Sequence, residues 1–341
     1  MQILVTGATG FVGFHVVNIL KQKGHAVVAL VRDIDKAKKL YDQHGITVDR
    51  FVKGSITDKQ VVVDALQGCD GVLHAAAITP MQAGSDADLF DTNVGGVKNV
   101  IGTACAQGVD NVVYVSSITA IFNSDASRMT PDAPVATSKH AYGRSKAQAE
   151  EYVRGLQAQG KSVKTVYPGG IIGPDDPGMS ATLMSLIYRM TQGFRITSGG
   201  TQQIDVRDLA AFIVALLERH EKKPARYLTA GHYIAWADFA DLLEDVSGAT
   251  LPRSQISGFV LRLIGNFYDI KRLFTPVASP ITAEMMRYAT QWPHVANAPE
   301  MAAMGITLRP LRETFADALR ALGERKLVDK ALLPRLFPRE K

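Results

Sequence analysis

Short apolar runs that alternate with helical patterns constrain the fold of this chain more than any other feature. The runs in the first half are ILV from Ile3, AVVALV from Ala26, VDRFV from Val48, GVLHAA from Gly71, NVVYVSS from Asn111 and VKTVYP from Val163. Between the first two runs, apolar residues recur at helical spacing from Val12 to Leu20, and Asp58 is placed to cap the helix after the third run. Strands that alternate with helices need crossover connections, which build a parallel sheet. The sequence therefore predicts an α/β fold with a doubly wound parallel sheet (Rossmann).

The sequence pattern changes after Pro168. The stretch GGIIGPDDPGMSATL is rich in Gly and Pro and predicts a loop that leaves the sheet. The segment QQIDVRDLAAFIVALLER predicts a strand, Asp208 as a helix cap and an amphipathic helix, and ARYLTAG predicts a further strand. We expect these three elements to return to the main domain, which then spans 1–173 plus about 203–232. A smaller, mostly helical C-terminal lobe spans about 174–202 plus 233–341.

Composition excludes several classes of protein. Of 341 residues, 38 are basic and 33 acidic, and this excess of +5 is spread along the chain, so no nucleic-acid partner is expected. Cys69 and Cys105 stand far apart and outside any CxxC pair, which argues against disulfides and metal sites and suits a reducing compartment. The first strand starts at Gln2, which leaves no room for a signal peptide, and no apolar run is long enough for an integral membrane segment. We expect a cytoplasmic protein.

The densest basic segment is ERKLVDKALLPRLFPREK at the C-terminus. Its pattern predicts a solvated or peripheral helix and tail. A basic amphipathic helix that contacts anionic lipid is the alternative.

Three spaced glycines, Gly7, Gly10 and Gly13, follow the first strand directly and open the first helix. Glycine permits the tight turn and lets the backbone approach a pyrophosphate, whose charge is stabilised by free N–H groups at the helix N-terminus. In this position the motif indicates a dinucleotide site. The contacts expected from this turn are Thr6, Gly7, Thr9, Gly10, Phe11, Val12 and Gly13.

The end of the second strand indicates which dinucleotide is bound. An acidic residue there would hold the ribose 2′-hydroxyl of NAD, but this chain has Arg32 after Val31. A guanidinium can hold a 2′-phosphate, and Lys36 can add charge. The sequence favours NADP(H), with NAD(H) as the alternative because Asp33 is near enough to reach the ribose. Capping of the next helix is the preferred role for Asp33.

Tyr142 and Lys146 stand four residues apart in a predicted helix and so project from one face. A phenol titrates near pH 10, and a neighbouring ammonium is expected to lower the pKa of Tyr142 towards useful acid/base strength. Ser117 ends the fifth strand at the carboxyl edge of the sheet, where ligands of open α/β folds bind. Its hydroxyl is placed to hold a carbonyl oxygen.

With these motifs in place, the sequence resembles the extended short-chain dehydrogenase/reductase family. The motifs TGATGFVG, GCDGVLHAAA, TNVGGVKNV, VVYVSSI, YGRSK, VYPGGIIGP and IDVRDLA stand in that family's order, over roughly residues 1 to 230. The resemblance implies that Tyr142 exchanges the substrate proton, that Lys146 binds the nicotinamide ribose and that Ser117, rather than Ser116, orients the substrate. Asn93 matches an asparagine with a structural or proton-relay role. The segment ALVRD is similar to the NADPH-using dihydroflavonol reductase and cinnamoyl-CoA reductase branch.

The same resemblance implies further cofactor contacts. Ser55 and Ile56 match the adenine end, although family members often carry an acidic residue before it. The residues that match the nicotinamide end and its surroundings are Ala75, Ala76, Ala77, Ser116, Pro168, Gly169 and Ile171. His74 is interpreted as a packed strand-end histidine rather than a catalyst, and His140 as a surface residue rather than a pocket edge.

The sequence therefore predicts an NADP(H)-dependent oxidoreductase that acts on a small carbonyl or alcohol substrate. The apolar segment FVLRLIGNFYDIKRLF favours a hydrophobic or aromatic ketone or aldehyde. Pocket residues are expected after Ala77, in 118–127 and in 179–188. The alternatives are a sugar-nucleotide epimerase or dehydratase with retained NAD, and a non-catalytic NADP-binding sensor or scaffold. Whether the chain is a monomer or a homodimer stays open.

Overall fold

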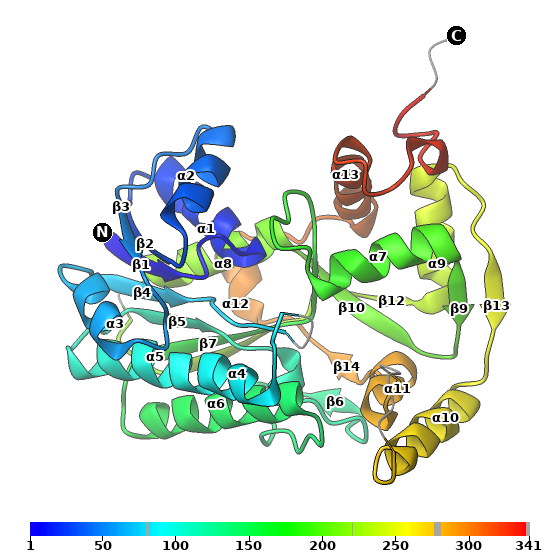
Figure 1. Ribbon diagram of the computed structural model, residues 1–341, viewed down its shortest axis with the longest axis horizontal. Helices are drawn as coiled ribbons and strands as arrows, with labels where there is room; N and C mark the ends of the chain where they lie inside the picture. Colours follow the sequence, from blue (N-terminus) through cyan, green and yellow to red (C-terminus); the bar gives the residue numbers. More distant parts are fainter. Residues whose placement is uncertain (80–81, 220, 276–280, 339–341) are drawn as a thin grey trace.

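A seven-stranded parallel sheet forms the centre of the protein in a computed structural model, which describes residues 1–79, 82–219, 221–275 and 281–338 (Figure 1). Its strands are β1 (Gln2–Thr6), β2 (Ala26–Val31), β3 (Arg50–Lys53), β4 (Gly71–His74), β5 (Val112–Val115), β7 (Val163–Pro168) and β11 (Ala225–Thr229). They lie in the order β11-β7-β5-β4-β1-β2-β3, and every neighbouring pair is parallel. The predicted doubly wound fold is confirmed.

Helices cover both faces of this sheet (Figure 1). The helices on one face are α1 (Phe11–Gln22), α2 (Ile34–Gln43) and α8 (Val206–Glu218), and those on the other are α3 (Lys59–Leu66), α5 (Gly96–Ala106) and α6 (Ala141–Ala158). Side chains alternate between the two cores, since Ile3 and Val5 pack on the α1 side and Leu4 on the α5 side. Strands that are buried on both faces explain the nearly continuous apolar runs of the sequence.

Carboxylates cap several helices of this domain. Asp33 accepts a hydrogen bond from the Lys36 backbone N–H, and Asp58 caps α3, both as expected. The predicted cap at Asp208 is wrong. Asp205 is the N-cap of α8, whereas Asp208 lies in its first turn and binds Arg309.

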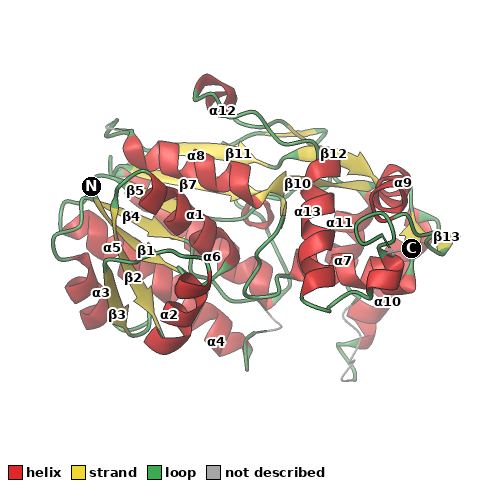
Figure 2. Ribbon diagram, turned by 90° about the horizontal axis from the view of Figure 1, so that it is seen from above, coloured by secondary structure: helices red, strands yellow, loops and turns green. Residues whose placement is uncertain are grey.

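The C-terminal lobe combines helices with small sheets (Figure 2). A three-stranded sheet contains β8 (Gly170–Ile172), β10 (Gly200–Asp205) and β12 (His232–Ala235), and β9 (Phe194–Ile196) pairs with β13 (Arg253–Gln255). The helices are α7 (Ala181–Gln192), α9 (Trp236–Ser247), α10 (Gly258–Lys271), α11 (Ala283–Thr290) and α13 (Leu311–Glu324), with a 3-10 turn at Lys330–Leu332. Between α11 and α13 lie β14 (His294–Val295), which pairs with β6 (Arg128–Met129), and α12 (Pro299–Ala303).

Two expectations for the region after Pro168 are wrong. The stretch expected as loop contains β8, because its glycine-rich backbone pairs with β10. The strand expected to return to the main domain is β10, which lies in the three-stranded sheet instead, although α8 packs with the α1 core and β11 joins the large sheet. The exact domain boundaries stay a prediction.

The described part of the basic C-terminal segment is anchored in the lobe. Val328 and Leu333 are buried in the core that α9 and α13 share. This packing suits the peripheral position that the sequence predicts; the last three residues of the chain, 339–341, lie outside the described residues.

A buried ion-pair network joins α8 to α13 and should contribute to stability. Asp205 accepts hydrogen bonds from Arg207 and from the Thr314 hydroxyl at 2.7 to 2.9 Å. Asp205→Ala removes one partner of a buried pair, so we expect a loss of about 3 kcal/mol in the free energy of unfolding, measured by urea denaturation. Asp317→Ala, at the more exposed end of the network, should cost less than about 1 kcal/mol. Equal losses for the two variants would contradict this assignment.

Candidate active site

The turn between β1 and α1 is held against the end of β4. Gly7 has a φ of +71°, and a Cβ there would lie 2.7 Å from the Ala76 backbone nitrogen. A Cβ on Gly13 would lie 2.1 Å from the Gly7 oxygen. Both positions therefore require glycine, and their lack of side chains lets three backbone segments meet.

The N-terminus of α1 is free to take an anion. Gly10 is its N-cap, no side chain caps it, and its first turn carries no acidic residue. Uncapped N–H groups and the helix dipole suit a pyrophosphate. The residues of this turn thus fit the dinucleotide that the motif predicts.

Arg32 stands directly after β2, which pairs with β1, and so lies at the same edge of the sheet as the glycine turn. Its side chain is exposed and makes no hydrogen bond or ion pair with any described residue. The Asp33 carboxylate caps α2 by accepting a hydrogen bond from the Lys36 backbone N–H at 3.0 Å. Lys36 itself is exposed. This arrangement leaves the guanidinium free for a phosphate.

The residues expected at the adenine end follow β3. The Ser55 hydroxyl is within 2.8 Å of the Thr57 hydroxyl, and Ile56 is buried against Gly96, where a Cβ would lie 2.3 Å from the isoleucine. Asn99 holds this loop by donating to the Ile56 and Thr57 carbonyls. Ile56 is therefore a packing residue at least as much as a ligand contact.

The residues expected at the nicotinamide end follow β4 and β7. Ala75 donates its N–H to the Thr6 carbonyl at 3.2 Å, beside the Gly7 turn. Gly169 follows Pro168 at the end of β7, and a Cβ there would lie 2.6 Å from the Ala230 oxygen. Ala77 is exposed, and Ile171 lies in β8.

Tyr142 is placed near Ser117 by the packing of α6 on the 3-10 turn Ile118–Ala120, which Ser117 caps. Burial raises the pKa of Tyr142, and a hydrogen bond with Ser117 lowers it, with a net upward shift. This direction is opposite to the sequence-based expectation that Lys146 would lower the pKa. At neutral pH Tyr142 is therefore held protonated.

Lys146 is buried, and its Nζ lies 3.5 Å from the Tyr114 hydroxyl and 5.3 Å from the centre of that ring. Burial lowers the pKa of Lys146 to about 8, and the negative charge of Glu150 opposes this shift. His74 is fully buried, with Nδ1 2.7 Å from the Thr6 hydroxyl. Burial and, secondarily, the charge of Lys146 lower the pKa of His74 to about 3. His74 is thus a packed neutral residue, as the sequence indicated.

A buried carboxylate, Glu150, lies one turn beyond Lys146 on the same face of α6. It accepts hydrogen bonds from the hydroxyls of Ser116 and Tyr167 and from Arg154 Nε, the last at 2.8 Å. Sequence reasoning missed Glu150, although its spacing of four from Lys146 and eight from Tyr142 was a usable signal. Ser116 thus serves this network, which supports Ser117 as the substrate hydroxyl.

Asn93 lies in a π-helical turn, Asp91–Gly95, between α4 (Asp86–Phe90) and α5. Its amide bonds both the N–H and the carbonyl of Ile78 and donates to the Ser145 hydroxyl at 3.1 Å. Ser145 in turn donates to the Tyr142 carbonyl. These bonds hold the loop after β4 against α6, which suits the structural alternative for Asn93.

Aromatic side chains from distant segments lie near Tyr142. The Phe122 ring centre is 4.2 Å from that of Tyr288 and 5.6 Å from that of Trp292. Burial raises the pKa of Tyr288. Its hydroxyl donates to Glu284 at 3.3 Å, and a Cβ on Gly143, next to Tyr142, would lie 3.1 Å from the same Glu284 oxygen, so this ring lies near Tyr142. Phe122 falls in the predicted stretch 118–127, whereas α11 and Trp292 were missed because nothing local in the sequence connects them to α6.

The loop before α6 is tied to α11. The Ser138 hydroxyl lies 2.9 and 2.8 Å from the two Glu284 oxygens, and His140 Nε2 lies 3.9 Å from the same carboxylate. His140 is therefore half-buried at the edge of the site rather than at the free surface. Of the other expected pocket stretches, Tyr188 is exposed on α7, and residues 80–81 lie outside the described residues.

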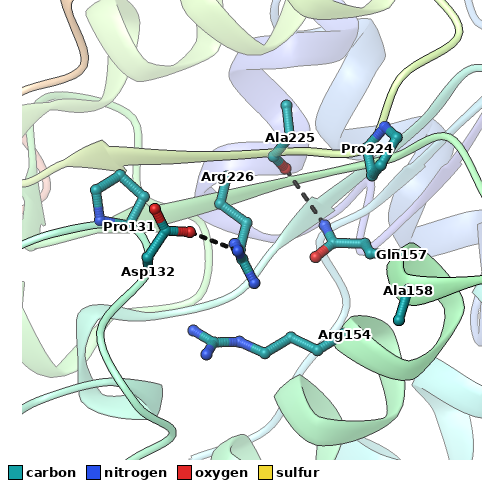
Figure 3. Close-up of a pocket in the computed structure, with 8 residues that line it drawn as sticks. All are labelled: Pro131, Asp132, Arg154, Gln157, Ala158, Pro224, Ala225 and Arg226. Atoms are coloured by element: carbon teal, nitrogen blue, oxygen red, sulfur yellow. Dashed lines mark hydrogen bonds and ion pairs between the residues drawn. The ribbon is translucent and has the colours of Figure 1, made fainter. Parts of the chain in front are cut away.

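A surface cavity of about 460 Å³ lies elsewhere, between α6 and the start of β11 (Figure 3). Arg154 and Arg226 project into it, but the first is paired with Glu150 and the second with Asp132. None of the predicted site residues lines this cavity, and its cations are already neutralised, so we do not assign the cofactor to it.

The described part of the chain contains neither a candidate membrane-spanning helix nor a candidate metal site. No helix there is long and apolar enough to cross a membrane. No cluster of His, Cys, Asp and Glu side chains among the same residues has the arrangement of a metal site.

Fold and site together define a dinucleotide-binding α/β protein with a Ser, Tyr and Lys constellation. The sequence profile of the NAD dependent epimerase/dehydratase family matches residues 3–230, and the chain belongs to this family of extended short-chain dehydrogenases/reductases. Family membership implies an NAD(P) nucleotide and a small-molecule substrate.

Relatives of different activities resemble this chain. Sterol demethylase protein B of Methylococcus capsulatus is 27% identical over 96% of this chain and 100% of its own length. Cinnamoyl-CoA reductase 1 of Petunia hybrida is 28% identical over 71% of this chain and 76% of its own, which agrees with the branch that ALVRD suggested.

Among solved structures, that of gox2253 matches with a TM-score of 0.82 at 23% identity, covering 96% of this chain and 99% of that one. The UDP-glucose-4-epimerase of Stenotrophomonas maltophila has a TM-score of 0.76 at 20% identity, over 96% and 99% of the two chains. At these identities the likeness concerns the fold alone.

The pKa of Lys146 predicts a pH dependence that Glu150 controls. A group with a pKa of about 8 loses its charge as the pH rises through 8, so cofactor-dependent turnover should fall on that alkaline limb. Glu150→Gln removes the charge that supports the ammonium, and the limb should move to lower pH in a kcat/KM profile. Glu151→Gln, at the adjacent exposed position, is the control and should leave the limb in place. An unmoved limb in Glu150→Gln, with thermal unfolding unchanged, would refute this coupling.

Proposed function

We propose that the protein is an NADP(H)-dependent oxidoreductase of the carbonyl reductase or alcohol dehydrogenase type. The observation that carries this proposal is the packing of the turn that Ser117 caps on α6, which carries Tyr142 and, one turn later, buried Lys146. This packing lies at the carboxyl edge of the sheet, where the glycine turn also lies. Intact proton-transfer residues beside a dinucleotide turn favour an enzyme over a silent nucleotide-binding protein.

The roles follow from the side chains. A nicotinamide dinucleotide held by the glycine turn would supply a hydride to a carbonyl carbon. Ser117 holds the carbonyl oxygen, and Tyr142, kept protonated by burial, donates its proton to that oxygen as the alcohol forms. The Lys146 ammonium stabilises the phenolate that Tyr142 becomes. Glu150 keeps Lys146 charged in its buried position.

The substrate is a small hydrophobic or aromatic ketone or aldehyde. Phe122, Tyr288 and Trp292 supply an aromatic wall near Tyr142. Relatives named as a cinnamoyl-CoA reductase and as 3-beta-hydroxysteroid dehydrogenases are consistent with apolar substrates. The support comes from this wall rather than from α10, whose apolar residues face outward.

Compartment and assembly belong to the same proposal. Cys69 and Cys105 are both free thiols, which suits a reducing cytoplasm.

The helices that carry Asn93 and Tyr142 lie on one face of the sheet, where a homodimer would form, and a monomer is equally compatible.

Tyr142→Phe tests the reaction. Without the phenolic proton, NADPH oxidation in the presence of aromatic ketones or aldehydes should fall by about 10²–10⁴-fold in kcat/KM. NADPH binding, followed by fluorescence, should persist. Retained carbonyl reduction by the variant would contradict the role of Tyr142, and turnover of a sugar nucleotide with tightly held NAD would favour the epimerase alternative.

Arg32→Ala tests the choice of nucleotide. Loss of charge-assisted hydrogen bonds to the 2′-phosphate should weaken NADPH binding by about ten- to a hundredfold and leave NADH binding nearly unchanged, as measured by titration calorimetry. Lys38→Ala, an exposed cation on the neighbouring helix, serves as control. Equal weakening for both nucleotides would argue against the phosphate contact.

A further inference from the structure

Helix α10 exposes an apolar face to solvent. Its outward apolar residues, together with Leu273 and Phe274 just beyond its C-terminus, are 43% to 81% exposed. The outward residues of the helix itself are Phe259, Val260, Leu263, Phe267 and Ile270. We call all of these residues together the α10 face. Five other large hydrophobic residues of the described chain are exposed, and no other element there carries more than two of them: Met1, Met184, Tyr188, Tyr233 and Met285. A contiguous apolar patch of this kind marks an interaction surface.

The way α10 packs explains why this face points outward. Its small residues lie on the inner side, where a Cβ on Gly265 would be 2.8 Å from the Ala283 Cα at the start of α11. The helix therefore makes its close contact through glycine, and the large apolar side chains of the α10 face lie on the opposite, exposed side. Figures 1 and 2 both show α10 at the periphery of the lobe.

The charge around the α10 face is positive. The segment 258–290 contains four basic residues, Arg262, Lys271, Arg272 and Arg287, and two acidic ones, Asp269 and Glu284. Both carboxylates are used within the protein, because Asp269 binds Arg272 and the Ala283 N–H, and Glu284 binds Ser138. Lys271 and Arg287 are exposed. Apolar residues beside exposed cations are typical of a helix that lies in the interface of an anionic membrane.

We propose that the α10 face docks on the surface of a lipid bilayer that contains anionic phospholipids, with the helix parallel to the membrane plane. A second copy of this chain fits less well, because two such faces would bring segments of the same positive charge together.

The docking face is connected to the active site through α11. This helix carries Tyr288 against Phe122 and binds the loop before α6 through Glu284. A carbonyl substrate dissolved in the bilayer would therefore meet the site beside the docked helix α10. This step rests on the proposed reductase function, whereas docking itself does not.

Vesicle sedimentation of the full chain tests the proposal. The protein should sediment with vesicles of phosphatidylcholine mixed with phosphatidylglycerol, less with phosphatidylcholine alone, and less at high salt. Phe267→Ser should weaken binding about tenfold, as expected for removal of one buried aromatic side chain. Lys271→Gln should weaken it about fivefold, the effect of one basic residue near an anionic surface. Tyr233→Ser, which alters an exposed aromatic residue outside this face, is the matched control and should bind as the unaltered chain does.

Three outcomes would overturn the proposal: no sedimentation with either vesicle, equal binding by Phe267→Ser and the unaltered chain, or a dimer in analytical ultracentrifugation that Phe267→Ser dissociates without any vesicle binding. Reduction of a water-soluble ketone without vesicles reports separately on the proposed function. Intact reduction without vesicle binding refutes docking alone, and vesicle binding without reduction refutes the reductase alone.

Discussion

The close approach of the Gly7 turn to the backbone of Ala75 and Ala76 is the constraint on which the rest of the structure depends. It brings the end of β1 and the end of β4 within van der Waals contact, with no room for a side chain at Gly7 or Gly13. Because all seven strands are parallel, the loops after β2, β5 and β7 lie at the same edge. Arg32, Ser117 and Pro168, which are far apart in sequence, thereby lie at one edge of the sheet.

Buried charge is the second organising element. An isolated ammonium is costly to bury, and burial lowers the pKa of Lys146 to about 8. The negative charge of Glu150, one turn away, opposes this shift, so the Lys146 ammonium keeps its proton at neutral pH. Glu150 is in turn stabilised by Arg154 and by two hydroxyl donors. One face of α6 therefore carries the phenol of Tyr142, the ammonium of Lys146 and the carboxylate that supports this ammonium.

Local sequence patterns predicted the elements that depend on local physics. The strand runs, the glycine turn and the caps at Asp33 and Asp58 follow from periodicity and from hydrogen-bond chemistry within a few residues. The strand that became β10 has the same local pattern as a strand of the large sheet, and only tertiary packing assigns it to the smaller one. The same holds for Tyr288 and Glu284. Glu284 is 146 residues from Ser138, and no local spacing in the sequence predicts the contact between them.

The segment FVLRLIGNFYDIKRLF shows what composition leaves undetermined. Its apolar residues at helical spacing predict an amphipathic helix, but amphipathicity does not say what the apolar side faces. In the structure, α10 turns Gly265 towards α11, so its large apolar side chains lie at the surface. The aromatic wall near Tyr142 is built from Phe122, Tyr288 and Trp292, residues that are unremarkable in sequence. An apolar helix next to such a wall, but facing away from it, suits contact with the medium in which an apolar substrate dissolves better than contact with the substrate itself.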